Sequence, residues 1–497
     1  MRWNLLFGGK AGQGPNFLTN LIGEVLVEQG FYVFYSRDYQ SLIRGGHNFN
    51  VLTFSDEKVG SNDSKMDVIV CLDENTKKLH LKDLKKAGIV LEGDYSNTYF
   101  AGRIFKILGL EFSLLDKKLK EIGKKYEENL SEAKKGYSEE TRKIEIPKLK
   151  TKNLKFTHGN AGISEGAIKS GLDCYFAYPM TPATSVMMEL AQKQIENNFV
   201  VIELENEIAV ANAGVGSCIT GAKAMVGTSG GGFDLMTETL SLCGIAQVPL
   251  VFFLSMRPGP ATGVATYTGQ GDLNIARHSG HGEFNRIVVC PGEPKEAEEL
   301  TNQAFYLSQK FRTPSIIVSD KHLGESFYTL SSKPEIVKVP RGCKLGRYNS
   351  YEVDKFGSAT EDSQIIKKNI LERKNNFERL GKESKKFKTY KVYGNKSSKN
   401  VIVSFGSTKC AILDAIRGLD VKFIQILYIE PFDLNVVKEI KDKNLILIEN
   451  SSSALIGDLI KEKTGIRIED KNKILRFDGR PFLCDELKEE IKKRLKR

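Results

Sequence analysis

The sequence has few cysteines and no two of them close together. Its eight cysteines are separated by about 25 residues or more, so it has no CxxC pair or tight cluster that could hold zinc or an iron–sulfur centre. Most lie in apolar runs, where cysteine behaves as a small core residue. This usage is typical of a reducing compartment, and we expect a cytoplasmic protein with no metal site of its own.

Long apolar runs are also absent. The longest, residues 248–256, has the length of a buried strand and falls far short of the ~20 apolar residues of a membrane span. The apolar run at the N-terminus is too short for a signal peptide. We therefore expect no association with a membrane.

The motifs of several enzyme classes are missing. The sequence has no P-loop, HExxH or GxSxG. A GxGxxG dinucleotide site would need a glycine at Phe17, although Asp38 lies near the position of a ribose-binding acid. His278 and His281 have no third ligand nearby. These absences argue against a nicotinamide dehydrogenase and against a histidine-bound metal.

The charge and length suggest a protein of several domains that does not bind nucleic acid. The formal net charge is +11, and the surplus lies mostly in residues 115–155 and 380–400. Solvated linkers explain such segments better than a nucleic-acid patch does, and a docking surface for an acidic protein is the intermediate alternative. The length of 497 residues suggests about three domains at ~150 residues each.

Short apolar strands alternate with helical stretches along most of the chain. This pattern predicts an α/β fold with parallel, doubly wound sheets. Changes in composition suggest a first domain, a charged connector, a second domain, a charged connector with one helix, and a third domain. The predicted boundaries are 1–115, 116–155, 156–330, 331–398 and 399–497.

The first candidate site is the glycine turn at residues 8–14, which follows a strand and opens a helix. Backbone N–H groups at such a turn suit a phosphate, whereas a tight turn without a ligand is the alternative. Arg44 stands beside paired glycines further along the chain. It is a second candidate for binding a ligand, and the alternative is that it is only a surface arginine.

Four further motifs follow predicted strands, where ligands of parallel α/β sheets bind. Two prolines make the segment 178–184 rigid and leave the Thr181 hydroxyl accessible to a ligand. The alternative is a rigid turn between a strand and a helix that binds nothing. Glu207 is one of three close glutamates, and could otherwise be a helix-dipole partner. The segment 228–232 could cradle an anion or permit close packing. Arg257 could clamp a carboxylate or form an interdomain salt bridge.

In their order and spacing these motifs resemble the alpha subunit of 2-oxoacid:ferredoxin oxidoreductases. The N-terminal GKAGQG and SLIRGG resemble the gamma subunit of the same enzymes. Met180 and Gly231 depart from the family, which usually has isoleucine and proline there. The segments that carry the alpha resemblance are YPMTPAT at 178–184, ENEIAVANAGVGS at 205–217, GTSGGGFDLM at 227–236, RPGPATG at 257–263, GQGDL through GHGEF at 269–284, SFGSTK at 404–409, EPF at 430–432 and FDGRPF at 477–482.

The resemblance implies a gamma domain, a domain that binds the pyrimidine ring of thiamine diphosphate, and a transketolase-C-like domain. It also implies a heteromer in which a separate beta subunit carries the magnesium–diphosphate GDG motif and an iron–sulfur cluster. This division explains why the present chain has neither. Coenzyme A would be a co-substrate and ferredoxin the electron acceptor.

The resemblance also implies roles for individual residues. Glu207 matches the glutamate that hydrogen-bonds the pyrimidine ring nitrogen and is the predicted catalytic residue. Thr181 and Arg257 match positions near the substrate carboxylate. The predicted cofactor-binding residues are Tyr178, Pro179, Thr228, Ser229 and Gly230. The predicted coenzyme A or phosphate turn comprises Gly12, Gly14 and Arg44.

The implied reaction is oxidative decarboxylation of a 2-oxoacid to an acyl-CoA and carbon dioxide, with the electrons passing to ferredoxin. We expect 2-oxoglutarate or a broad range of 2-oxoacids as the substrate. The alternatives are a pyruvate- or indolepyruvate-type enzyme, or a non-catalytic paralogue that acts as a scaffold.

Overall fold

The computed structural model describes residues 1–40, 46–151, 153–342 and 349–495. The chain forms two compact units, the first comprising Met1–Thr157, Ser326–Ser332 and Leu483–Leu487 and the second the remaining residues. The predicted α/β class is confirmed, with three sheets of seven, seven and five strands. None of the helices in the described part of the chain is both long and apolar enough to cross a membrane.

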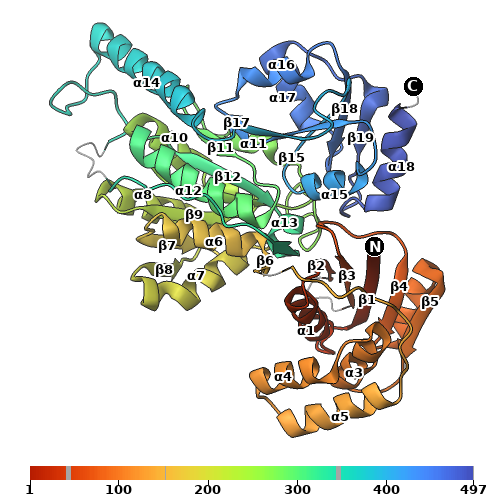
Figure 1. Ribbon diagram of the computed structural model, residues 1–497. Helices are drawn as coiled ribbons and strands as arrows, with labels where there is room; N and C mark the ends of the chain where they lie inside the picture. The colour runs from red at the N-terminus through yellow and green to blue at the C-terminus, as the bar shows by residue number, and fades with distance from the viewer. Residues whose placement is uncertain (41–45, 152, 343–348, 496–497) are drawn as a thin grey trace. The chain divides into compact units, whose positions relative to one another are not determined.

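The first unit is built on a mixed seven-stranded sheet with the order β5-β4-β1-β3-β2-β13-β6 (Figure 1). Its elements are β1 (Arg2–Lys10), α1 (Pro15–Glu28), β2 (Tyr32–Asp38), β3 (His47–Ser55), β4 (Met66–Cys71), α2 (Glu74–His80), β5 (Leu84–Glu92), α3 (Asn97–Leu108), α4 (Phe112–Ile122), α5 (Tyr126–Ser138), β6 (Lys155–His158) and β13 (Phe327–Leu330).

The sheet of the first unit is mixed, so the prediction of a parallel sheet holds only in part here. β4 runs parallel to β1 and β5, but β3 runs antiparallel to both β1 and β2. Only residues 39–46 separate β2 from β3, too few for the crossover that a parallel pair needs, so the two strands must point in opposite directions. Side chains still alternate as expected, because Leu5 and Phe7 enter the main core while Leu6 joins a smaller cluster.

The charged segment predicted as a connector contains most of α4 and all of α5, and α5 packs closely on α3. The contact depends on two glycines. A Cβ at Gly102 would lie 2.1 Å from the Ala133 carbonyl oxygen, and one at Gly136 would lie 2.0 Å from the Tyr99 carbonyl oxygen. The backbones of α3 and α5 therefore approach each other more closely than they could if residues 102 and 136 carried side chains.

The second unit contains a seven-stranded sheet with the order β17-β11-β12-β10-β9-β7-β8. All its strands for which the pairing is given are parallel, except β17, which pairs antiparallel with β11. The elements are α6 (Gly159–Lys169), β7 (Cys174–Ala177), α7 (Thr184–Asn197), β8 (Val200–Glu203), α8 (Glu207–Ile219), β9 (Ala224–Thr228), α9 (Gly230–Leu235), α10 (Thr237–Ala246), β10 (Val251–Met256), α11 (Leu273–His278), β11 (Ile287–Val289), α12 (Pro294–Phe311), β12 (Ser315–Asp320), α13 (Lys321–Glu325) and β17 (Tyr428–Glu430).

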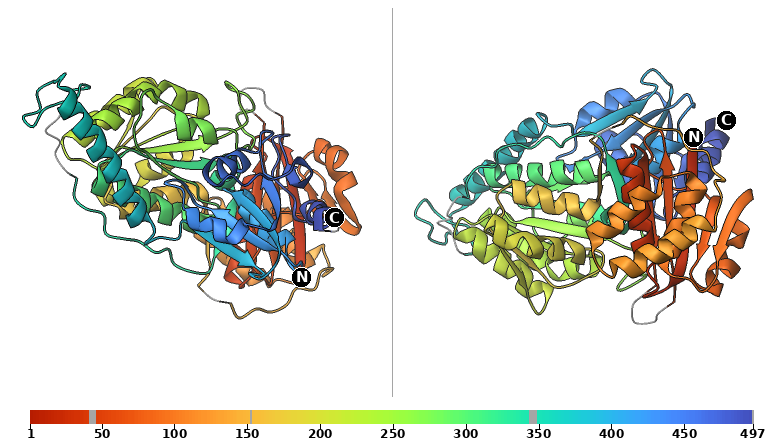
Figure 2. Two further views of the ribbon diagram at one scale, coloured as in Figure 1. Left: turned by 90° about the horizontal axis from the view of Figure 1, so that it is seen from above. Right: turned by 60° about the horizontal axis from the view of Figure 1, so that its bottom comes forward.

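Helices cover both faces of this sheet, as a doubly wound fold requires. On β10, Phe252 and Leu254 pack with α8, α9 and α10, whereas Val251 and Phe253 pack with α6, α7 and α12. Figures 1 and 2 show the strands of this sheet with helices packed around them. The central strands β9, β10 and β12 are buried on both faces and therefore read as continuous apolar runs.

The second unit also holds a five-stranded sheet with the order β14-β16-β15-β18-β19. One apolar cluster includes residues of both its sheets, such as Leu254 and Val403. The remaining elements are α14 (Ser363–Ser384), β14 (Tyr390–Gly394), β15 (Asn400–Phe405), α15 (Thr408–Ala415), β16 (Lys422–Ile426), α16 (Val437–Ile440), β18 (Asn444–Glu449), α17 (Leu455–Thr464), β19 (Lys473–Leu475) and α18 (Cys484–Leu495), whose first turn belongs to the first unit.

The α3–α5 contact yields a stability prediction. We expect Gly136→Ala to lower the free energy of unfolding by about 1–3 kcal/mol, because the new methyl group meets backbone atoms that cannot rotate away. Gly216→Ala in α8 is the control, since nothing lies within 4 Å of its added Cβ and alanine favours the helix. Thermal unfolding measures both variants, and equal midpoints for the two would contradict the close contact.

Candidate functional site

The candidate site lies at the carboxyl edge of the seven-stranded sheet of the second unit. There β10, β9 and β7 are neighbours, and each ends in a predicted motif. Tyr178 follows β7, Thr228 is the last residue of β9, and Arg257 follows β10. Glu207 begins α8 just after the edge strand β8. Because parallel strands end at the same edge, motifs distant in the sequence meet here.

Glu207 is the buried member of the three glutamates. Its exposed fraction is 4%, whereas Glu203 and Glu205 are exposed. The side chain of Asn206 caps α8 by accepting a hydrogen bond from the Ala209 N–H at 2.9 Å, which holds Glu207 in the first turn. The Oε1 atom of Glu207 is buried and has no hydrogen-bond partner among the described residues. A buried carboxylate oxygen without a partner is costly and indicates a place where a ligand donates.

The glycine turn after β9 makes room for this carboxylate. A Cβ at Gly232 would lie 2.6 Å from Glu207 Oε1 and 2.1 Å from Thr228 Oγ1, so only glycine fits. Position 231 is different, because nothing lies within 4 Å of a Cβ added there. The turn therefore needs its third glycine for close approach, but not its second.

Thr228 and Ser229 lie beneath the turn and are buried. The Thr228 hydroxyl lies 3.8 Å from the Met180 sulfur, which brings the segment after β7 against the end of β9. Ser229 Oγ is buried without a hydrogen-bond partner among the described residues. The predicted residues of these two motifs thus come together, with a second polar oxygen available to a ligand.

Arg257 and Thr181 are also neighbours. Arg257 Nη1 donates to the Thr181 carbonyl oxygen at 2.7 Å, and burial lowers the pKa of this half-buried guanidinium from its usual value. A guanidinium carries five N–H donors, so most of those on Arg257 remain available to an acceptor such as a carboxylate. Pro179 on the same segment is half-buried, whereas the Tyr178 side chain is 41% exposed.

Asp272 is a member of the site that the sequence reasoning did not identify. Burial, reinforced by Asp234, raises the pKa of its carboxyl to about 6, although Arg257 acts in the opposite direction. A Cβ at Gly230 would lie 2.6 Å from Asp272 Oδ2, so this carboxylate packs on the glycine turn. The only signal in the sequence was its place in the GQGDL segment.

Gln270 holds the segment that carries Asp272. Its Nε2 donates to the Phe405 carbonyl oxygen at 3.2 Å and to Asp320 Oδ2 at 3.4 Å, and its Oε1 accepts from the Asn450 N–H at 2.9 Å. One buried amide therefore ties the ends of β12, β15 and β18 together. Such contacts between distant segments have no signature in the sequence.

Asn160 has a similar role for the segment after β7. It is fully buried, and its Nδ2 donates to the Pro182 carbonyl oxygen at 2.9 Å and to Ser185 Oγ at 2.6 Å. The Gly159-Asn160 pair near the start of the second unit thereby positions the loop that carries Thr181.

The predicted phosphate turn belongs to the first unit. Gly12 and Gly14 have φ values of 90° and 83°, and Gly14 is the N-cap residue of α1. The turn is therefore formed, with exposed Lys10 beside it. Arg44 lies outside the described residues. Across the described ranges, no group of three or more His, Cys, Asp or Glu side chains is arranged to hold a metal ion.

The turn at 230–232 yields a prediction with a matched control. We expect Gly232→Ala to lower the free energy of unfolding by about 1–3 kcal/mol, because the methyl group must displace Glu207 or Thr228. Gly231→Ala should be neutral or slightly stabilising, since its Cβ meets open space in the first turn of α9. Urea unfolding of both variants measures the difference, and an unchanged midpoint for Gly232→Ala would contradict the geometry.

Asp272 yields a prediction about pH. Its folded-state pKa of about 6 exceeds the model-compound value of 3.8, so ionisation is disfavoured in the folded chain. The protonated Asp272 carboxyl therefore contributes to the free energy of unfolding. This contribution is complete below about pH 4 and is lost as the pH rises through 6. We expect Asp272→Asn to gain about 1–2 kcal/mol relative to the native chain between these pH values. Parallel curves of unfolding free energy against pH would contradict this.

Sequence comparison identifies the relatives of the chain. Residues 165–379 match the thiamine-diphosphate-binding family of pyruvate flavodoxin/ferredoxin oxidoreductases, and residues 4–96 match the pyruvate ferredoxin/flavodoxin oxidoreductase family. The 2-oxoacid:ferredoxin oxidoreductase subunit alpha of Saccharolobus solfataricus is 28% identical, with 99% of this chain and 98% of that protein covered. The 2-oxoglutarate synthase subunit KorA of Archaeoglobus fulgidus is 35% identical over 40% of this chain and 55% of its own length.

Structural comparison agrees with the fold. The 2-oxoglutarate:ferredoxin oxidoreductase from Magnetococcus marinus, solved with 2-oxoglutarate, coenzyme A and succinyl-CoA bound, matches with a TM-score of 0.89. The match covers 99% of both chains at 20% sequence identity. The resemblance predicted from the sequence is confirmed by these matches, because the chain is similar along nearly its whole length to alpha subunits of 2-oxoacid:ferredoxin oxidoreductases.

Proposed function

We propose that this chain forms one wall of a thiamine-diphosphate site that a beta subunit completes. The joint enzyme would oxidatively decarboxylate a 2-oxoacid to an acyl-CoA and carbon dioxide, with the electrons passing to ferredoxin. The observation that supports this most is the Glu207 carboxylate, which is buried, has an oxygen without a partner among the described residues, and lies beside a glycine turn.

The residues of the site fit the aminopyrimidine end of the cofactor. Glu207 Oε1 and Ser229 Oγ are buried acceptors that a ring N–H and an amino group could satisfy. Gly232 leaves a space beside them that any side chain would fill. When bound, thiamine diphosphate supplies the carbon nucleophile and the electron sink for decarboxylation. Magnesium and the iron–sulfur cluster would belong to the beta subunit.

Glu207 has the catalytic role in this proposal. Its place in the first turn of α8 fixes the carboxyl at the edge of the sheet. The carboxylate would hold a proton at the cofactor's ring nitrogen and so set the tautomer of the ring. Tyr178, Pro179, Thr228 and Gly230 would line the ring and exclude water from it.

Arg257 and Thr181 would bind the substrate carboxylate. The Thr181 carbonyl oxygen accepts a hydrogen bond from Arg257 Nη1 at 2.7 Å and so holds one end of the guanidinium. Because the guanidinium is planar and rigid, this bond also fixes the directions of its other N–H groups. Asp272 would tune this arginine electrostatically. 2-Oxoglutarate or a broad range of 2-oxoacids is the proposed substrate, since both KorA and the enzyme from Magnetococcus marinus carry 2-oxoglutarate in their names.

The surface around Glu207 supports a partner chain. Ile208, Leu235 and Ile202 are 49%, 49% and 38% exposed, and they belong to α8, α9 and β8 near the mouth of the site. Exposed apolar side chains around a polar site are typical of an interface. We propose that the beta subunit covers them and closes the site. Coenzyme A would be the co-substrate, and the turn at Gly12 and Gly14 could hold its phosphate.

The proposal predicts the effect of a single atom change. We expect Glu207→Gln, assayed with the co-purified beta subunit, to lower viologen reduction at least about 100-fold, because an amide is a poor proton acceptor. Glu205→Gln is the control, since this neighbouring carboxylate is exposed, and it should retain near-native rates. 2-Oxoglutarate, pyruvate, indolepyruvate and branched-chain 2-oxoacids should be compared as substrates.

Co-elution with the beta subunit should be unchanged in both variants, which separates loss of chemistry from loss of assembly. Near-native viologen reduction by Glu207→Gln would refute the catalytic role. A native chain that assembles but reduces viologen with none of the 2-oxoacids would support the scaffold alternative.

A further inference from the structure

A second polar pocket lies in the second unit, away from the candidate site. Its volume is about 500 Å³, and residues 282–286, just before β11, form one wall while α14 forms another. It therefore lies at the amino end of β11. The candidate site lies beyond the carboxyl ends of the strands that run parallel to β11, so the two are at opposite edges of the same sheet.

Arg286 is a buried cation in this pocket. Only 8% of the residue is exposed, and its guanidinium stacks on the Phe284 ring at 4.4 Å from the centroid. Nη1 makes two long contacts, at 3.4 Å to the Ala276 carbonyl oxygen and 3.2 Å to Ser279 Oγ. No carboxylate within the described ranges lies at ion-pair distance from it. Burial lowers the pKa of Arg286 to about 10, so it is still charged at neutral pH.

The nearest compensating charge is already engaged. Glu430 attracts Arg286, but it pairs with Lys463 at 2.9 Å. Arg277, only 7% exposed, lines the same pocket and pairs through Nη2 with Glu462 at 2.6 Å. The Nε of Arg277 is buried and has no hydrogen-bond partner among the described residues. Two buried guanidiniums thus present donors that the chain does not satisfy.

The whole lining has an excess of positive charge. Five cations and three carboxylates line the pocket, namely Arg277, Arg286, Arg373, Lys374 and Lys463 with Glu283, Glu430 and Glu462. Arg373 pairs with Glu352, which is not part of the lining. Phe284 and Phe377 add an apolar surface, and Asn285 Nδ2 donates to the Arg373 carbonyl oxygen at 2.8 Å, which ties the loop to α14.

We propose that this pocket binds a small organic anion that has a phosphate or carboxylate head and an apolar body. The head would satisfy Arg286 and the Nε of Arg277, because a guanidinium fork matches both kinds of oxyanion. The apolar body would pack against Phe284 and Phe377. A buried cation whose nearest carboxylate is already paired is otherwise costly, so a bound anion accounts for its presence.

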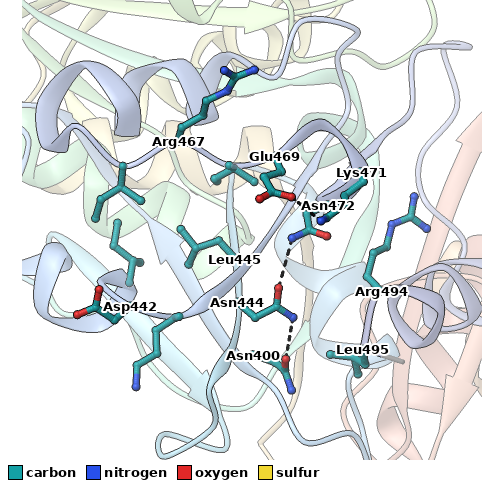
Figure 3. A pocket seen from close by; sticks show the side chains of 14 residues that line it. Asn400, Asp442, Asn444, Leu445, Arg467, Glu469, Lys471, Asn472, Arg494 and Leu495 are labelled. Atoms are coloured by element: carbon teal, nitrogen blue, oxygen red, sulfur yellow. Dashed lines mark hydrogen bonds and ion pairs between the residues drawn. The ribbon is translucent and has the colours of Figure 1, made fainter. Parts of the chain in front are cut away.

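Another pocket in the same unit provides an internal comparison. It has a volume of about 480 Å³ and lies at the start of β15 and β18 (Figure 3). There the polar groups satisfy one another, since Asn472 donates to Asn444 at 3.3 Å and Asn444 to Asn400 at 2.9 Å. Arg467 in its lining is exposed, so water solvates its charge. This arginine serves as the control position.

The test is isothermal titration calorimetry, which measures the heat of binding when an anion is added to the full-length chain at constant ionic strength. Phenyl phosphate and benzoate are the probes, inorganic phosphate tests the head alone, and benzyl alcohol tests the apolar body alone. We expect saturable binding of at least one aromatic anion, weakened at least about tenfold by Arg286→Met and unchanged by Arg467→Met. Comparison of the two probes identifies the preferred head group.

A second variant covers the case in which Arg286→Met fails to fold. Arg286→Lys keeps the charge but has no planar fork, and it should also weaken binding at least about tenfold. The proposal is overturned if the native chain shows no saturable binding of either aromatic anion up to about 10 mM. It is also overturned if a folded Arg286 variant binds as tightly as the native chain.

Discussion

The turn at residues 230–232 has no side chains, and the candidate site depends on this. Gly230 lets Asp272 approach from one side, and Gly232 lets Glu207 and Thr228 approach from the other. Two carboxylates and a hydroxyl can therefore surround one short segment at the end of β9. A methyl group at either glycine would close the space in which a ligand could meet the buried oxygen of Glu207.

A cluster around Lys409 shows how this fold compensates a buried charge. Lys409 is 1% exposed and contacts Glu293 and Glu296 at 2.7 Å each, and Gln425 donates to Glu296 at 2.6 Å. This cluster joins α12 to the five-stranded sheet with every charge paired. Glu207 Oε1, in contrast, is buried without a hydrogen-bond partner among the described residues. Ligand binding accounts for this difference, because the ligand then makes the missing hydrogen bond.

Strands of the second unit such as β9, β10 and β12 can be recognised in the sequence, because each is buried on both faces and reads as an apolar run bounded by turn residues. Periodicity does not show the direction in which strands pair, so the antiparallel β3 was missed. Residues 421–429 form one apolar run in the sequence, which by itself indicates a single strand, but they contain β16 and β17, which belong to different sheets. Tertiary pairing decides such a break, and the run itself carries no sign of it.

The candidate site was predictable where its residues form local motifs. Thr181, Glu207 and Arg257 each follow a strand within a distinctive segment, and the structure brings those segments to one edge, although their roles remain predictions. Gln270 and Arg286 could not be found in this way. Gln270 matters because it reaches Phe405 and Asn450, and Arg286 because no carboxylate in the described chain reaches it. The environment of a polar side chain, rather than its type, decides whether it is a structural partner or a binding group, and that environment exists only after folding.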